Sequence, residues 1–109
     1  MTPIREVDVH QAAELAAIGA VLLDVREPDE WRAGHVADAV HQPLGGLNPA
    51  SIGLGTRIVA VCRSGNRSGK AAVELARAGH DVVNMRGGML AWSKAGLPMV
   101  DDGGEPGTV

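Results

Sequence analysis

The hydrophobic positions of the chain form short, nearly uninterrupted runs separated by longer segments of mixed character. Runs at residues 20–23, 58–61 and 82–85 are rich in Val, Leu and Ile. Their length and composition are typical of strands that are buried on both faces. Val40 and His41 are interpreted as a further, brief strand. The pattern therefore predicts short strands spread along the chain.

The segments between these runs carry the signals of helices. Asp8 and Gln11 have the spacing of a capping box and predict a helix that continues to about residue 17. Pro28 suits the first position of a short second helix. Further helices are predicted over about residues 67–78 and 89–95, and the chain between residues 43 and 55 is predicted to be mostly loop.

Strands that alternate with helices predict βαβ units and a parallel sheet that is covered on both sides. In such sheets, ligands bind beyond the carboxyl ends of the strands. The residues that follow the predicted strands are therefore expected to gather at one edge of the sheet. These residues are Asp24, Arg26, Cys62, Arg63 and Arg86.

Composition narrows the class of protein. The chain has 109 residues, of which 45% are hydrophobic and 21% are charged. These values predict one globular domain over residues 1–100, followed by a flexible tail rich in Gly and Pro over residues 101–109. No apolar run is long enough to cross a bilayer. The net charge of −3 argues against general binding to nucleic acids or anionic membranes.

Cys62 is the single cysteine, which excludes an internal disulfide and a four-cysteine metal site. The four histidines lack the spacing of metal ligands, and neither a metal nor a cofactor is expected. The first residues do not have the pattern of a signal peptide. The expected location is therefore a reducing cytoplasm, where a free thiol persists.

Cys62 opens a loop that joins a predicted buried strand to a helix; residues 62–68 are called the cysteine loop below. A Gly-Asn turn allows this loop to curl, so that its backbone N–H groups form an anion-binding nest at the helix start. The two arginines of the loop could attract an anion and lower the pKa of the thiol. The alternative is a small buried hydrophobic residue. The predicted binding residues are Arg63, Ser64, Gly65, Asn66, Arg67 and Ser68.

Three stretches of the chain resemble the rhodanese-like family. They read LDVREPDEW followed by GHV (residues 23–31 and 34–36), CRSGNRS (62–68), and GGMLAW followed by GLP (87–92 and 96–98). The resemblance implies an α/β fold, with a five-stranded parallel sheet between two layers of helices. It also implies a thiosulfate sulfurtransferase in which Cys62 attacks the donor, becomes a persulfide and passes the sulfur on.

The resemblance leaves the acceptor open: cyanide, glutathione, thioredoxin and a sulfur-carrier protein are all candidates. Because no second cysteine exists, the acceptor is expected to be another molecule. Supporting roles are considered for Asp24, Arg26 and Arg86, although a structural ion pair is favoured for the first two. The chain departs from the family at Asp38, where a Gly is common, which puts the shape of that loop in doubt.

Other functions are compatible with some of these residues. A phosphatase of the cell-cycle type, or an arsenate reductase, would need five residues between the Cys and the Arg, whereas only four separate Cys62 from Arg67. A non-catalytic binding module commonly lacks the cysteine. A sulfur carrier loaded by a partner, and a redox sensor that oxidises at Cys62, would use the same thiol.

Overall fold

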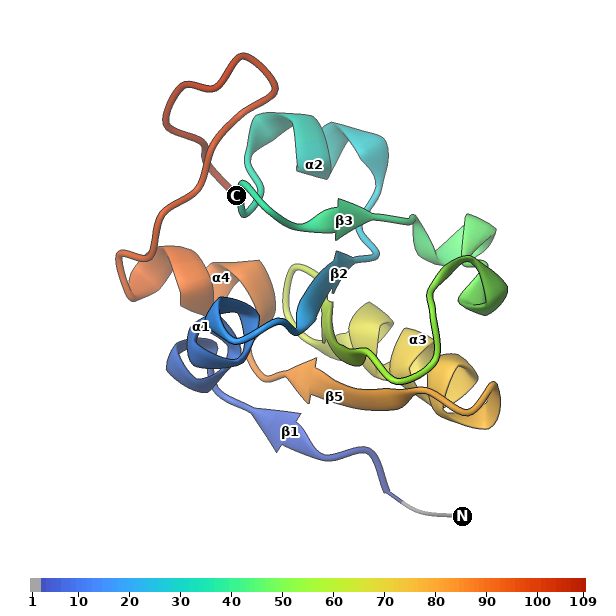
Figure 1. Ribbon diagram of the computed structural model, residues 1–109. Helices are drawn as coiled ribbons and strands as arrows, with labels where there is room; N and C mark the ends of the chain where they lie inside the picture. Colours follow the sequence, from blue (N-terminus) through green and yellow to red (C-terminus); the bar gives the residue numbers. More distant parts are fainter. Residues whose placement is uncertain (1–2) are drawn as a thin grey trace.

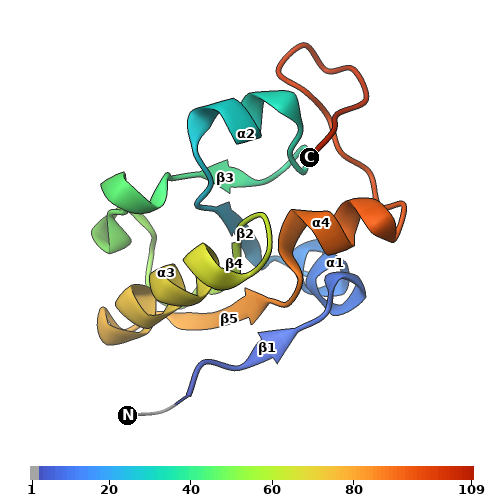
Figure 2. The ribbon, with the colours of Figure 1, turned by 180° about the vertical axis from the view of Figure 1, so that it is seen from behind.

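The computed structural model describes residues 3–109. At its centre is a sheet of five parallel strands. The strands are β1 (Glu6–Val7), β2 (Val21–Asp24), β3 (Val40–His41), β4 (Arg57–Val61) and β5 (Asp81–Met85). Their order across the sheet is β1-β5-β4-β2-β3, with β4, labelled in Figure 2, in the centre (Figures 1 and 2). The α/β class and the five-stranded parallel sheet are thereby confirmed.

Helices cover both faces of the sheet, as Figures 1 and 2 show from opposite sides. Helices α1 (Val9–Ala17) and α4 (Gly88–Lys94) pack on one face, and α3 (Asn66–Arg77) packs on the other. Helix α2 (Pro28–Ala33) lies beside β3 at the edge of the sheet. The molecule therefore has three layers, α/β/α.

The central strand divides the core into two clusters because successive side chains of a strand point to opposite faces. Val59 and Val61 face the cluster that includes Trp92 of α4. Ile58, Ala60 and Cys62 face the cluster under α3. The side chain of Cys62 thus continues the buried row of β4 on the α3 face.

Most predicted elements lie within one or two residues of their observed bounds. The capping box at Asp8 and Gln11 is present, with both reciprocal hydrogen bonds. Strand β1 was not identified from the residue pattern, although β3, which is equally short, was. The segment predicted as mostly loop contains two short 3₁₀ helices, η1 (Leu44–Gly46) and η2 (Pro49–Ser51).

The C-terminal segment folds back on the domain. Val100 forms an isolated bridge with His35, and the Thr108 N–H donates to the carbonyl of Ala33. Val109 packs against the core cluster of α1 and α4. The flexibility expected of residues 101–109 stays a prediction, but the path of the segment is fixed by these contacts in the structure.

The structure also bears on the loop at Asp38 and on the first residues of the chain. The turn at Asp38 needs no glycine, because among residues 3–109 only glycines have a positive φ. Met1 and Thr2, which belong to the segment judged not to be a signal peptide, lie outside the described residues.

Within residues 3–109, no helix combines the length and the apolar character required to cross a membrane.

Candidate functional site

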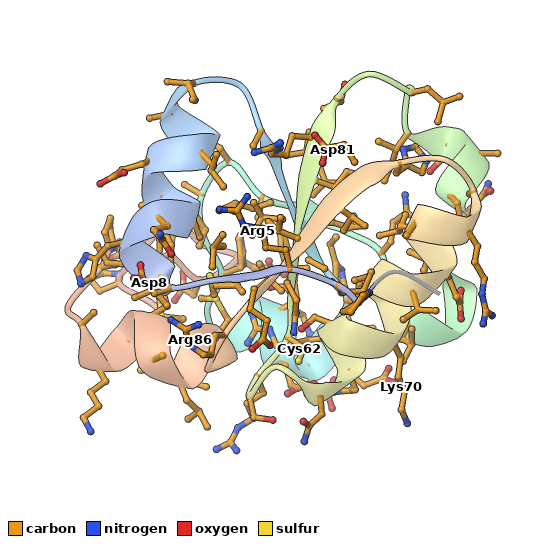
Figure 3. All side chains as sticks on the ribbon, turned by 90° about the horizontal axis from the view of Figure 1, so that it is seen from below. Arg5, Asp8, Cys62, Lys70, Asp81 and Arg86 are labelled. Carbon is orange, nitrogen blue, oxygen red and sulfur yellow. The ribbon has the colours of Figure 1, made fainter. Side chains whose placement is uncertain are left out.

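The candidate site lies at the carboxyl ends of the central strands, where the sheet geometry places residues that follow β2, β4 and β5. Figure 3 shows Cys62 and Arg86 at the end of the sheet away from Asp81, which begins β5. Cys62 itself is fully buried. Its sulfur therefore lies beneath the cysteine loop.

The cysteine loop turns back over the sulfur at Gly65, whose φ of 108° is in the left-handed region. The Gly65 N–H, at the start of α3, donates to Cys62 Sγ at 3.0 Å. The Ser68 hydroxyl, one turn into α3, lies 3.2 Å from the same sulfur. The sulfur is therefore contacted by a backbone donor and a side-chain donor at a helix N-terminus.

Opposing influences set the pKa of the Cys62 thiol. Burial has the largest single effect and raises the pKa. Hydrogen bonds from the Ser68 side chain, and from the backbone N–H groups of Ser68, Gly65 and Ser64, act together to lower it. Their sum outweighs burial, so the pKa of Cys62 lies below its ordinary value. The loop thus favours the thiolate, which is the nucleophilic form.

The turn before α4 holds the cysteine loop from the other side. The Met89 N–H donates to the Cys62 carbonyl at 2.8 Å, and the Leu90 N–H donates to that of Arg63 at 3.0 Å. Gly88 has a positive φ, and a methyl group there would overlap the carbonyl oxygens of Cys62 and Arg63. Only a glycine allows the two segments to approach so closely.

Asp24 and Arg26 form a buried ion pair, as the structural interpretation predicted. Asp24 accepts hydrogen bonds from Arg26 Nε and Nη2, and Nη2 also donates to the Gly34 carbonyl at 2.6 Å. The pair therefore ties the end of β2 to the end of α2. No hydrogen bond joins it to the cysteine loop among the residues that the structure describes.

The side chains of the predicted binding residues point in different directions. Arg63, Ser64 and Asn66 are exposed, so their backbones shape the loop while their side chains face solvent. Arg86 is also exposed. Ser68 is buried against the sulfur.

Arg67 contacts a residue that sequence reasoning missed. Its terminal nitrogens donate to the two carboxylate oxygens of Glu30 on α2, at 2.6 and 2.9 Å. Glu30 was given no role from the sequence, because the pattern gives no sign of a partner 37 positions away. The guanidinium is thus held at the rim of the site by α2.

Asn84 is the second residue that sequence reasoning missed. It is a buried polar residue in β5, and its amide contacts both Ser68 and Gly65. A polar residue inside a strand buried on both faces needs hydrogen-bond partners. That signal was available in the run of residues 82–85.

A sequence model of the rhodanese-like domain matches residues 8–95. The chain belongs to the rhodanese-like family. It is 36% identical over 100 residues to a thiosulfate sulfurtransferase of Pseudomonas syringae, a match that covers 84% of this chain and 90% of that protein. The family to which the chain belongs is thus one of sulfurtransferases.

Two other matches bear on the extent of this rhodanese-like domain. The chain is 45% identical over 83 residues to an uncharacterized protein of Synechocystis sp., covering 73% of this chain but 46% of that relative. The chain therefore spans about half the length of that relative. The crystal structure of a rhodanese-related protein from Thermoplasma volcanium is similar with a TM-score of 0.83 and 28% identity, covering 88% of this chain and 97% of that one.

The Glu30–Arg67 pair of this rhodanese-like domain predicts a defined acid sensitivity. The hydrogen bond from Arg67 is the main cause that lowers the pKa of Glu30 to about 2. Because this value is below that of an unfolded glutamate, about 4.3, the pair stabilises the fold above that pH. The stabilisation, up to about 1 kcal/mol for a partly exposed pair, is lost as the pH falls toward 2.

Urea unfolding at a series of pH values tests this with Glu30→Gln. We expect the parent to be more stable than the variant at pH 6, and the difference to shrink as the pH falls through the unfolded-state pKa. Glu14→Gln, on the exposed side of α1, is the matched control and should follow the parent. A difference between parent and Glu30→Gln that persists unchanged at low pH would show that the carboxylate charge is not its source.

Proposed function

We propose that this domain is a sulfurtransferase that moves sulfane sulfur from thiosulfate, or a similar donor, to a thiophilic acceptor through a persulfide on Cys62. The observation that carries the proposal is the position of Cys62 Sγ. It lies at the N-terminus of α3, with the Gly65 N–H at 3.0 Å and the Ser68 hydroxyl at 3.2 Å. Such donors stabilise a thiolate and an anion that approaches it.

The reaction follows from this arrangement in two balanced steps. The Cys62 thiolate attacks the outer sulfur of thiosulfate, a new S–S bond forms, and the old one breaks with its electron pair on the leaving sulfite. The acceptor, cyanide or a thiolate, then attacks the outer sulfur of the persulfide and releases the Cys62 thiolate. Splitting the transfer through a covalent intermediate is ordinary nucleophilic catalysis.

The surroundings of the sulfur favour a small donor. Cys62 is fully buried beneath the loop, so its sulfur offers no open surface to a bulky donor. A persulfide placed there would have Ser64, Gly65 and Ser68 N–H groups around it. No other cysteine occurs in the chain, which favours an acceptor on another molecule and, for a free thiol, a reducing cytoplasm.

The contact between Arg67 and Glu30 argues against phosphatase chemistry. A phosphatase of the cell-cycle type needs the loop arginine to bind phosphate oxygens. Here both terminal nitrogens of Arg67 are bound to a carboxylate, and the loop is one residue shorter than that class requires. A shorter loop suits a bare sulfur better than a tetrahedral ester.

The intact mass of the protein after incubation with thiosulfate tests the proposal. A gain of one sulfur atom on the parent chain is expected, and cyanide should remove it. No gain on folded protein would eliminate thiosulfate as the donor. It would favour a carrier that receives its sulfur from a partner protein.

A further inference from the structure

The Ser68 hydroxyl has one proton and two acceptors beside it. Its oxygen lies 3.2 Å from Cys62 Sγ and 2.6 Å from Asn84 Oδ1. A hydroxyl donates one hydrogen bond at a time. Ser68 therefore donates either to the sulfur or to Asn84, and the shorter distance favours Asn84.

The amide of Asn84 is oriented by groups that can only accept. Its Nδ2 donates to the Gly65 carbonyl at 3.0 Å and to Glu6 Oε2 at 3.1 Å. A flipped amide would place its oxygen against both acceptors. Asn84 Oδ1 therefore faces Ser68. Because an amide oxygen carries no proton, it can only accept a hydrogen bond from the Ser68 hydroxyl.

The two protonation states of Cys62 use this arrangement differently. In the thiol state, the S–H can donate to Ser68 Oγ while Ser68 donates to Asn84, so that each group has a partner. In the thiolate state, the sulfur can accept the hydrogen bond from the Ser68 hydroxyl. If Ser68 donates to the sulfur, Asn84 Oδ1 loses its donor inside the protein. An unpaired buried acceptor costs free energy. Asn84 thus favours the thiol state, in opposition to the loop N–H groups.

We propose that Asn84 is a positioning residue that holds the Ser68 proton away from Cys62 and so limits how strongly the site stabilises the thiolate. This arrangement would keep the Cys62 thiolate a strong nucleophile, a benefit that rests on the proposed sulfur transfer. A thiolate that is stabilised further becomes more abundant at neutral pH but less reactive. Asn84 therefore keeps the sulfur both ionisable and reactive.

Charged groups also occur on the elements around this region, and none is altered in the variants below. Glu6 on β1 contacts Asn84, the Asp24–Arg26 pair follows β2, and Glu30 on α2 binds Arg67 of the loop. Arg63 of the loop and Arg86 before α4 have side chains that are exposed to solvent. Among the described residues, the hydrogen bonds to the sulfur come from uncharged groups. A change at Asn84 therefore acts on the thiol without removing a charge.

The test is an ultraviolet titration of the thiolate. The chain suits it, since Cys62 is the only cysteine and no tyrosine absorbs in its place. In Asn84→Ala, the Ser68 hydroxyl is free to donate to the sulfur. The midpoint of thiolate formation should therefore fall by roughly one pH unit, the scale of a hydrogen bond to a charged group. Ser68→Ala alone should change the midpoint much less, because Asn84 already holds the Ser68 proton away from the sulfur in the parent. In the Asn84→Ala background, Ser68→Ala should raise the midpoint by about the amount that Asn84→Ala lowered it.

The double variant separates the route through Ser68 from a general loosening of the loop. In the Ser68→Ala background, Asn84→Ala should change the midpoint little, because no hydroxyl proton remains to be released. An increase with Asn84→Ala alone, no change at all, or an equal decrease in both backgrounds would overturn the proposal. Asn84→Leu, which also lacks an acceptor but fills the volume, carries the same expectation if the alanine variant does not fold.

Val83→Ala is the matched control, because Val83 is the neighbouring residue of β5 and faces the opposite core cluster. It should lower stability and leave the titration unchanged. The titration needs no sulfur donor, so its outcome is independent of whether thiosulfate is the substrate. If sulfur transfer occurs, Asn84→Ala should also lower the plateau rate at high pH by about threefold, as expected for a thiolate of lower basicity.

Discussion

A Cys62→Ser variant is expected to take up no sulfur from thiosulfate and to lose sulfur transfer to the uncatalysed background. A serine hydroxyl is a far weaker nucleophile than a thiolate and cannot form an S–S bond. The fold should persist, because the smaller oxygen still fits the buried position and can accept the hydrogen bond from the Gly65 N–H. Intact mass and transfer to cyanide measure the loss, and circular dichroism measures the fold.

The comparison is sharp because the chain has one thiol. Sulfur that remains on folded Cys62→Ser protein would contradict the role of Cys62. An exposed serine on α4, Ser93, provides the matched substitution Ser93→Ala, which should behave as the parent. Transfer that survives in Cys62→Ser would end the proposed mechanism, whatever the mass data show.

The fold was predictable because its signals are local. Apolar runs mark β2, β4 and β5, and a capping box and a helix-starting proline mark α1 and α2. The parallel arrangement then places the ends of these strands at one edge without further information. Strand β1 was missed because its strand character depends on pairing with β5, which lies far away in the sequence.

The candidate site was predictable only in part, for a physical reason. The cysteine loop is contiguous in sequence, so its turn and its helix start could be inferred from residues 62–68. The contacts that tune it come from elsewhere in the chain: Glu30 from α2 and Asn84 from β5. Such partners are determined by packing, which a single sequence does not display. Their roles in the site emerge once the sheet brings the segments together.

Replacing Asp24 by Asn is expected to destabilise the fold by about 3–5 kcal/mol, because it leaves the Arg26 charge buried without its counter-ion. The Asp24 and Arg26 side chains are 1% and 0% exposed, and water cannot replace the lost carboxylate. The Asp24 carboxylate accepts from Arg26 Nε and Nη2 and from the backbone N–H of Arg26. An amide at this position keeps one acceptor oxygen but removes the charge and places an NH₂ group against a cation.

The exposed pair Asp29–Arg32 on α2 is the matched control, because it joins the same two residue types. Its side chains are 90% and 57% exposed, so Asp29→Asn should cost at most about 1 kcal/mol. Urea unfolding of the two variants measures the difference directly. Equal, small losses would show that Arg26 finds another counter-charge or a route to solvent. A large loss confined to Asp24→Asn would establish that the buried pair, which connects the end of β2 to the end of α2, stabilises the fold.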